Sequence, residues 1–318
     1  MSEVLLVSLG STPGLRASDE ELAGSLERAG VRVRVAAAAA PGPRRTLALT
    51  DLAWARAARG AAARALAGSR PDAVIYSTIT AALLAPRPGA IRLDALAAAN
   101  RPGRHGVWQR PRERALLARA PLLVPVSEEA LAGAPPRRAP AVVVPIAVEA
   151  SGPPAARDIA AITYAADARK KGLDRVLAAW ALAHRDGEEL LVAGGAPFAP
   201  APGVRALGRL ERADYRALLR RARVYVSAPR REEYGIAQLE ALADGAMLVA
   251  LDGGPAYAAL APARAADPRL VGPDLARQIR LALDDPPASY APALEPFSPR
   301  NVERIVAERL LPALLGSA

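Results

Sequence analysis

The stretch RVYVSAPRREEYGIAQLEALADGAMLVALD, residues 223–252, decides the fold class. It opens with a short apolar run, RVYVSAP, that predicts a buried strand, and it closes with a second one, AMLVALD. Between them, a charged loop leads to Gly235, and from Ile236 the apolar residues recur with helical spacing. Strand, loop, helix and strand in this order are typical of a parallel α/β sheet.

The same alternation of strands and helices runs along both halves of the 318-residue chain. The loop ASGPPAARD, residues 150–158, separates the halves and is the best predicted domain boundary. We therefore predict an N-terminal domain over 1–152, a second domain over 153–296, and a final helix over 297–318 that crosses back to the first domain. Strands are predicted at 3–10, 31–38, 71–78, 120–127, 140–148, 159–166, 189–195, 223–229 and 246–252. Ser18 is predicted to cap the first helix, with Glu21 completing a capping box.

Composition narrows the possible classes of function. The chain has no cysteine, which excludes disulfides and cysteine–zinc sites and fits a reducing cytoplasm. No apolar run is long enough to predict a membrane span. The net charge is +10, and residues 87–138 hold ten arginines against four acids. That segment predicts a face for anionic lipid or an anionic substrate, while arginine on a solvated surface is the simpler alternative. No basic stripe interleaved with aromatics indicates nucleic acid.

The two glutamates around Gly235 suit a nucleotide-sugar. The helix that begins at Ile236 presents free N–H groups and a positive dipole end, which can hold a phosphate. Glu240, one turn into that helix, can accept two hydrogen bonds from a ribose diol. Glu232, on the loop before it, can reach a second polyol beyond the phosphates. The alternative is that Glu232 and Glu240 are ordinary solvated acids.

The stretch 232–245 resembles the donor motif of retaining GT-B glycosyltransferases of the glycogen-synthase-like and mannosyltransferase-like kind (glycosyltransferase family 4, group 1). The resemblance implies two Rossmann-like, doubly wound domains facing a central cleft. It also implies metal-independent transfer of a hexosyl group from a nucleotide-diphosphate sugar to an acceptor hydroxyl, with no cofactor. The donor would contact Glu240, Gly235, Ile236 and Tyr234, with Glu232 catalytic. In ITYAADARKKGLDRVLAAWA, residues 162–181, Lys171 matches the lysine that neutralises the donor phosphates.

One position departs from the family pattern. The family usually has an arginine five residues before this lysine, where this chain has Ala166. Arg169 and Lys170 lie nearby in sequence and could supply the missing charge, and Arg16 is our first choice from the N-terminal half. The departure leaves open a catalytically degenerate, nucleotide-sugar-binding regulatory protein. A nucleotide-sugar epimerase on the same fold is the other alternative.

The N-terminal half supplies looser candidates. The loop LGSTPG follows the first strand and places Gly10 and Gly14 where a backbone could approach the donor. In RLDALAAANRPGRHGVWQR, residues 92–110, relatives of this fold carry acceptor and catalytic groups, often a histidine. We take His105 as a catalytic candidate and Asp94, Asn100 and Trp108 as acceptor candidates. A capped surface loop with Trp108 as a core anchor is the alternative. The predicted partners are the nucleotide-sugar, a glycan, lipid-linked or small-molecule acceptor, and an anionic membrane at the inner face.

Overall fold

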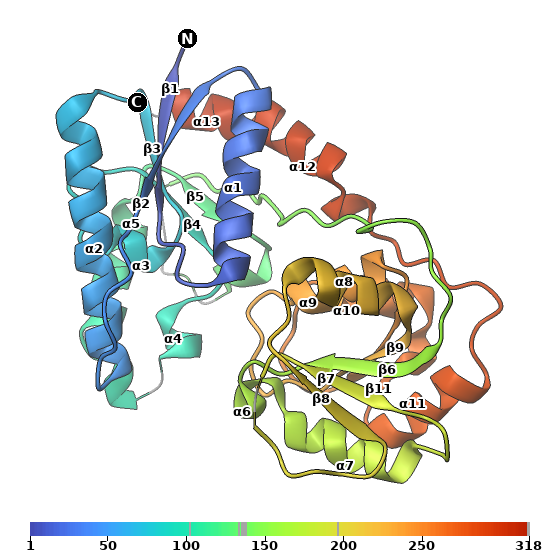
Figure 1. Ribbon diagram of the computed structural model, residues 1–318. Coiled ribbons are helices and arrows are strands. Elements are labelled where there is room, and N and C mark those ends of the chain that lie inside the picture. The colour runs from blue at the N-terminus through green and yellow to red at the C-terminus, as the bar shows by residue number, and fades with distance from the viewer. Residues whose placement is uncertain (102, 133, 135–138, 196, 317–318) are drawn as a thin grey trace. The chain divides into compact units, whose positions relative to one another are not determined.

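The computed structural model describes residues 1–101, 103–132, 134, 139–195 and 197–316. The chain divides into two compact units (Figure 1). Unit 1 comprises Met1–Ala147 and Pro299–Ala318, and unit 2 comprises Val148–Ser298. The C-terminal segment therefore belongs to unit 1, and the boundaries fall a few residues before 152 and after 296.

Unit 1 contains a five-stranded parallel sheet in the order β2-β1-β3-β4-β5. The chain runs from β1 outward to β2 and then returns to the other side of β1 with β3, so the switch point lies between β1 and β3. The strands are β1 (Glu3–Ser8), β2 (Arg32–Ala37), β3 (Ala73–Tyr76), β4 (Ala90–Leu93) and β5 (Leu123–Pro125).

Both faces of this sheet are covered. Along β1, Leu5 and Val7 pack into one apolar cluster and Val4 and Leu6 into another, because successive side chains of a strand point to opposite faces. Alanines of α2 fill the first cluster, and leucines of α1 with the C-terminal helices fill the second. The helices are α1 (Pro13–Arg28), α2 (Leu47–Gly68), α3 (Ile79–Ala82), α4 (Ala97–Asn100), α5 (Gln109–Arg119), α12 (Pro299–Ile305) and α13 (Leu311–Gly316). Two 3-10 turns, η1 (Gly103–Gly106) and η2 (Glu129–Leu131), and a π turn (Val306–Leu310) complete the unit.

Two predictions in unit 1 are wrong. Ser18 is not the cap of α1: the helix begins at Pro13, and the Thr12 hydroxyl accepts from the Leu15 amide at 3.2 Å. Residues 140–148 are extended but form only a bridge from Ala141 to Leu123. Their ladder stays short because Pro125, at the end of β5, has no N–H to donate back.

Unit 2 contains a six-stranded parallel sheet in the order β11-β10-β9-β6-β7-β8. The chain adds β7 and β8 on one side of β6 and then β9 to β11 on the other, so the switch point lies between β6 and β9. The strands are β6 (Ile159–Tyr164), β7 (Leu190–Ala193), β8 (Val204–Gly208), β9 (Ala222–Ser227), β10 (Met247–Leu251) and β11 (Val271–Gly272). The sequence did not indicate the edge strands β8 and β11, which are too short or too exposed for an apolar run.

Figure 1 shows α7 and α11 on one side of this sheet and α8 and α9 on the other. Trp180 of α7 is fully buried and packs with Ile279 of α11 beneath the strands. The helices are α6 (Ala168–Lys171), α7 (Leu173–Ala183), α8 (Arg212–Arg221), α9 (Ile236–Ala243), α10 (Leu260–Ala266) and α11 (Leu275–Asp284), with 3-10 turns η3 (Pro268–Leu270) and η4 (Glu295–Phe297). None of the helices described is both long and apolar enough to cross a bilayer.

Candidate functional site

The candidate site lies at the switch point of the unit 2 sheet. Strand β6 runs into α6, and its neighbour β9 runs into the charged loop 228–235. Ligands of open parallel sheets bind outside the carboxyl ends of the strands at such a point. The amides of Arg230 and Arg231 both donate to the Lys170 carbonyl, at 2.9 and 3.2 Å, so the two segments are fastened together.

Gly172 makes this close approach possible. Its φ of 64° is in the left-handed region, and a Cβ there would lie 2.0 Å from the carbonyl oxygen of Ala228. No other residue type fits a backbone against a backbone at that distance. Gly172 therefore fixes Lys171 beside the loop that carries the two glutamates.

The first ion pair of the site joins Lys171 and Glu232. The Lys171 Nζ lies 2.5 Å from Glu232 Oε2, and the carboxylate side chain is only 6% exposed. Gln238, on the first turns of α9, donates from Nε2 to the same oxygen at 3.0 Å and to the Ser227 hydroxyl at 3.1 Å. The Tyr257 hydroxyl also donates to Ser227 Oγ, at 3.2 Å. Glu232 is thus held by one cation and one amide, both from elements next to the switch point.

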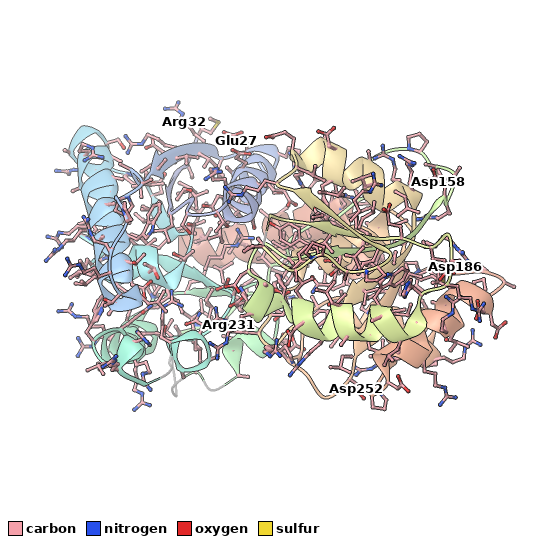
Figure 2. All side chains as sticks on the ribbon, turned by 60° about the horizontal axis from the view of Figure 1, so that its bottom comes forward. Glu27, Arg32, Asp158, Asp186, Arg231 and Asp252 are labelled. Carbon is pink, nitrogen blue, oxygen red and sulfur yellow. The ribbon has the colours of Figure 1, made fainter. Side chains whose placement is uncertain are left out.

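A second cluster joins Lys170, Glu233 and Arg231. The Lys170 ammonium contacts Glu233 Oε2, and Arg231 Nε lies 3.3 Å from Glu233 Oε1. Burial raises the pKa of Glu233, but the adjacent Lys170 and Arg231 outweigh it, and the pKa is lowered on balance. Arg231, labelled in Figure 2, comes from the loop after β9. Counting Lys171 and Glu232 as well, three cations face two carboxylates, which leaves the site net positive.

Gly235 turns the chain into α9. Its φ is 89°, and a Cβ would lie 2.8 Å from the Tyr257 ring, so both conformation and space require glycine. Helix α9 then starts at Ile236. The backbone N–H groups of this first turn have no partner within the helix. Tyr234 is 4% exposed and is a packing residue of the loop.

Glu240 is not the solvated surface acid of the alternative interpretation. Its side chain is 8% exposed and accepts from Arg212, at 2.7 Å to Nη2, and from Arg216, at 3.4 Å to Nη1. Within the described chain, these contacts all go to Oε1. Arg216 also donates to Asp244, at 2.5 Å.

Arg212 and Arg216 were missed by the sequence analysis. The two arginines are four residues apart on α8. Glu240 and Asp244 are also four residues apart, on α9 and at its C-cap. These matching spacings of opposite charge were the signal that could have predicted the pairs. Gln238 and Ser227 were also missed, because a polar residue between two motif glutamates carries no mark of its role.

Arg169 and Ala166 both lie near the switch point. Each is exposed, Ala166 directly after β6 and Arg169 within α6. The α6 residues that pair with the two glutamates are Lys170 and Lys171, and within the described residues Arg169 forms no ion pair.

In unit 1, the loop after β1 is shorter than predicted. Gly10 has a φ of 56° and fits a glycine requirement, whereas Gly14 lies inside α1. Arg16, also in α1, donates from Nη1 to the Gly10 carbonyl at 2.8 Å and is exposed. The helix therefore includes the last two residues of the predicted loop, Pro13 and Gly14.

A buried polar cluster, also missed, occupies the switch point of sheet 1. Ser8, at the end of β1, donates to Asp19 at 2.6 Å, and Arg92 of β4 lies 3.6 Å from the same carboxylate. Ser77, following β3, accepts from the Leu9 amide at 3.0 Å. Burial raises the pKa of Asp19, although Ser8 and Arg92 counteract it. Serines at strand ends are too common for sequence alone to single them out.

The residues predicted for the acceptor are dispersed over the segment after β4. Asp94 directly follows β4, Asn100 ends α4, and His105 lies half-buried in η1. Trp108 is half-buried against the unit 1 core, and its Nε1 donates to the Ala48 carbonyl at 3.1 Å, which matches the core-anchor alternative.

Known proteins share this architecture. HepE of Anabaena, solved in complex with UDP and glucose, matches with a TM-score of 0.73 at 16% identity over 98% of this chain and 100% of that chain. Sucrose-phosphate synthase of Thermosynechococcus elongatus matches with a TM-score of 0.67 at 16% identity, over 99% and 95%. WaaG, a glycosyltransferase involved in lipopolysaccharide biosynthesis, matches with a TM-score of 0.64 at 16% identity, over 99% and 98%. No curated protein matches in sequence.

The predicted GT-B fold class is therefore confirmed. Residues 158–285 also match the family model described as "Glycosyl transferases group 1". The matched range includes Lys171, Glu232 and Glu240, so the whole candidate site of unit 2 belongs to it.

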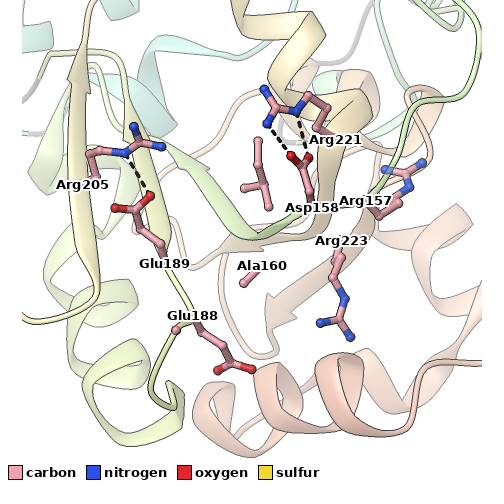
Figure 3. Close-up of a pocket in the computed structure, with 10 residues that line it drawn as sticks. Arg157, Asp158, Ala160, Glu188, Glu189, Arg205, Arg221 and Arg223 are labelled. Atoms are coloured by element: carbon pink, nitrogen blue, oxygen red, sulfur yellow. Dashed lines mark hydrogen bonds and ion pairs between the residues drawn. The ribbon is translucent and has the colours of Figure 1, made fainter.

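Unit 2 also holds a pocket of about 350 Å³ at the opposite, amino edge of its sheet (Figure 3). Arg221 pairs there with Asp158 at 2.5 Å and Arg205 with Glu189 at 2.9 Å, while Arg157 and Arg223 donate to backbone carbonyls. Because ligands of open parallel sheets bind at the carboxyl ends of the strands, we assign the ligand to the Lys171–Glu232 edge.

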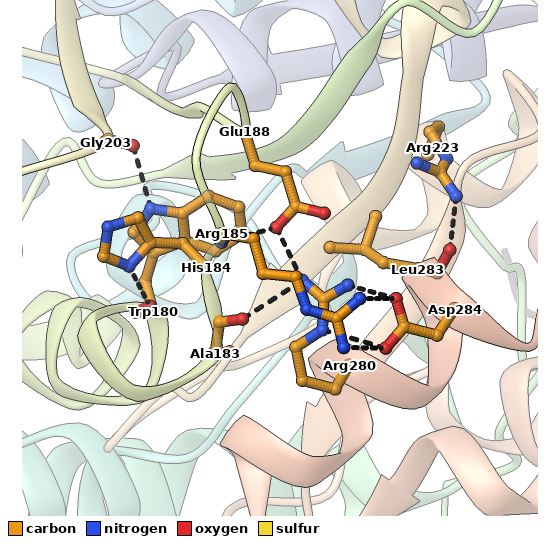
Figure 4. A network of polar contacts seen from close by, with 10 residues as sticks. All are labelled: Trp180, Ala183, His184, Arg185, Glu188, Gly203, Arg223, Arg280, Leu283 and Asp284. Carbon is orange, nitrogen blue, oxygen red and sulfur yellow. Dashed lines mark hydrogen bonds and ion pairs between the residues drawn. The ribbon is translucent and has the colours of Figure 1, made fainter.

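Asp284 and Asp285 make structural contacts. Figure 4 shows Asp284 between Arg185 and Arg280, and Arg280 also donates to the Ala183 carbonyl at 3.1 Å. Asp285 pairs with Arg269 at 3.0 Å. In the same view, His184 stacks on Trp180. These contacts fasten α11 to α7. Among the described residues, no three His, Cys, Asp or Glu side chains are grouped to hold a metal.

Proposed function

We propose that this chain transfers a hexosyl group from a nucleotide-diphosphate sugar to an acceptor hydroxyl, with retention of configuration and without a metal. The observation that carries the proposal is the Lys171–Glu232 pair, set at the sheet 2 switch point beside the start of α9. A net positive cluster next to free helix N–H groups suits a pyrophosphate.

The two partners of the pair have separate roles in this proposal. Lys171 leaves Glu232 to bind the donor phosphates, where its charge stabilises the negative charge that develops as the sugar–phosphate bond breaks. Glu232, still held by Gln238, is then available for the sugar hydroxyls. Gln238 Oε1, buried without a partner in the described residues, can accept a further hydroxyl.

Glu240 is proposed to bind the ribose. Arg212 and Arg216 fix its carboxylate through Oε1, which leaves Oε2 to accept from a diol. HepE was solved with UDP and glucose, so uridine nucleotides are the first to test, followed by GDP, ADP and TDP with their sugars. We further propose a cytoplasmic enzyme whose acceptor is a glycan, a lipid-linked sugar or a small molecule.

The test compares Glu232→Gln with Glu240→Gln, using Asp186→Asn as the control for an exposed acid of the same unit. Glu232→Gln should abolish turnover of the sugar nucleotide and leave the Kd of the bare nucleoside diphosphate nearly unchanged. Glu240→Gln should weaken that Kd about tenfold to a hundredfold, the effect of losing one charge-assisted hydrogen bond. If both variants change the Kd equally, the division of roles is wrong. If no nucleotide shifts the melting temperature of the wild type, the donor site itself is refuted.

One observation favours a second candidate. Because Ala166 stands where the family has an arginine, the chain could bind the sugar nucleotide without turning it over. Calorimetric binding of a sugar nucleotide, combined with no transfer and no donor hydrolysis, would establish this regulatory alternative in place of the enzyme.

A further inference from the structure

Three aliphatic side chains of unit 1 stand out of the surface together. Leu47 and Leu49, at the start of α2, are 46% and 49% exposed, and Val107, just after η1, is 65% exposed. The hydrogen bond from Trp108 Nε1 to the Ala48 carbonyl joins the two segments. Because Ala48 lies between the leucines and Trp108 follows Val107, one bond fixes all three within a single region. We call Leu47, Leu49 and Val107 the apolar tip.

The segments that carry the apolar tip have basic side chains and no acidic ones. Residues 38–50 and 95–112 contain no aspartate or glutamate. Their arginines are Arg44, Arg45, Arg101, Arg104, Arg110 and Arg112. Arg101 turns inward to Asp51, at 2.7 Å, and ties α2 to the end of α4. Arg44, Arg45, Arg104 and Arg112 are exposed, and in the described residues none of them pairs with a carboxylate.

Three exposed arginines of unit 2 are arranged differently. Arg221 pairs with Asp158, Arg230 with Asp174 and Arg264 with Asp252, each between 2.5 and 2.7 Å. These pairs set exposed arginines beside acids, whereas residues 38–50 and 95–112 supply arginines and no acid.

Only part of the wider segment 87–138 contributes exposed cations. Arg92 is buried beside Asp19, and Arg101 is committed to Asp51. Arg137 and Arg138 lie outside the described residues. The start of α2, which that segment does not include, contributes two of the three exposed aliphatic residues.

We propose that the apolar tip and its four exposed arginines dock on an anionic lipid bilayer. Exposed aliphatic side chains with unpaired cations close by in the chain match the boundary between acyl chains and charged headgroups. Arginines attract the negative surface, and the tip enters the apolar layer, so both parts contribute. A nucleic acid would use the arginines alone. This docking does not depend on sugar transfer, so either proposal can fail without the other.

The experiment is co-sedimentation of the full chain with vesicles of phosphatidylcholine alone or with about 30% phosphatidylglycerol added to give an anionic surface. Wild type should bind the anionic vesicles and be released by about 0.5 M salt, because screening shortens the range of the attraction. The variant Leu47→Ser/Leu49→Ser/Val107→Ser should reduce the bound fraction at least about fivefold, with no change of Tm. So should Arg44→Gln/Arg45→Gln/Arg104→Gln/Arg112→Gln, which should also remove the dependence on salt.

Matched controls come from unit 2. Leu182→Ser removes a leucine that is 83% exposed, and Arg230→Gln/Arg264→Gln removes two paired surface arginines. Both should bind like wild type. The proposal is overturned if wild type does not sediment at low salt, if it binds neutral vesicles equally well, or if loss of the apolar tip has no effect. Binding to duplex DNA that is stronger than binding to vesicles and needs only the arginines would assign the surface to nucleic acid instead.

Discussion

The two sheets have equivalent switch points but use them differently. In unit 1, the edge between β1 and β3 holds Ser8, Asp19 and Arg92, all of them 5% exposed or less. In unit 2, the edge between β6 and β9 holds Lys171 and Glu232, with side chains 18% and 6% exposed. The first cluster secures α1 and β4 to β1, whereas the second stands at the surface with an excess of positive charge.

The difference shows what makes a switch point a binding site. A buried ion pair that loses one partner leaves an uncompensated charge in a medium of low dielectric constant, so the Asp19–Arg92 pair is not exchangeable. Lys171 ends a short helix and reaches solvent, so a phosphate can replace Glu232 as its partner. The same strand topology therefore gives a buried structural cluster in unit 1 and a candidate binding site in unit 2.

The largest expected effect tests the structural side of this contrast. Asp19→Ala should lower the free energy of unfolding by about 3–5 kcal/mol, since Arg92 would remain buried without its carboxylate. Urea unfolding followed by circular dichroism measures it. Glu20→Ala, which removes the exposed acid next in sequence, should change the value by less than about 0.5 kcal/mol. Equal effects of the two substitutions would remove the distinction between the clusters.

The next prediction addresses the exchangeable pair. Lys171→Met should weaken nucleoside diphosphate binding by about 1.5–3 kcal/mol, because a charge-assisted contact to phosphate is lost. Isothermal titration calorimetry measures the Kd, and Lys171→Arg should recover part of the affinity. Lys170→Met is the matched control, since Lys170 pairs with Glu233 instead. A larger loss of affinity from Lys170→Met than from Lys171→Met would show that Lys170, and not Lys171, binds the phosphate.

A smaller effect is expected at the position where the chain departs from its family. Ala166 is exposed after β6, so Ala166→Arg should fold normally. If the natural site is weakened, the added cation should raise donor affinity about tenfold, or 1.4 kcal/mol, in calorimetry. That result together with absent turnover favours the regulatory alternative. Unchanged affinity would show that Lys170, Lys171 and Arg231 already suffice for the phosphates.

The last prediction concerns a buried acid of unit 1. Burial raises the pKa of Glu113 to about 7, although the Ala97 amide and Arg101 counteract it. Its stabilising contribution is full below the unfolded pKa near 4.5 and is lost as pH rises through about 7. Glu113→Gln should therefore gain stability relative to wild type between pH 5 and 8, by about 1–2 kcal/mol. Chemical unfolding across that range checks the trend, and a constant difference between the two proteins contradicts it.

The sequence predicted the donor-side elements well because their signals are local. The apolar runs around β6, β9 and β10 and the glycine before α9 are visible in any window of ten residues. The cap of α1 was placed wrongly because Thr12 and Ser18 are both good caps, and only packing against β1 decides how far the helix extends. The prediction of a strand over 140–148 is wrong because the neighbouring strand β5 ends in Pro125. The residues of 140–148 themselves carry no sign of that proline.

By itself, the sequence determined the alternating α/β order, the positive excess and the two glutamates around Gly235, since each depends on residue type and spacing alone. Only the tertiary structure decided which groups meet. It brought Lys171 to Glu232 across 61 positions, sealed Asp19 against Arg92, and left Leu47 and Val107 exposed among unpaired arginines. Such pairings depend on strand order and on the close approach at Gly172, and both are set by the packing of segments far apart in the chain.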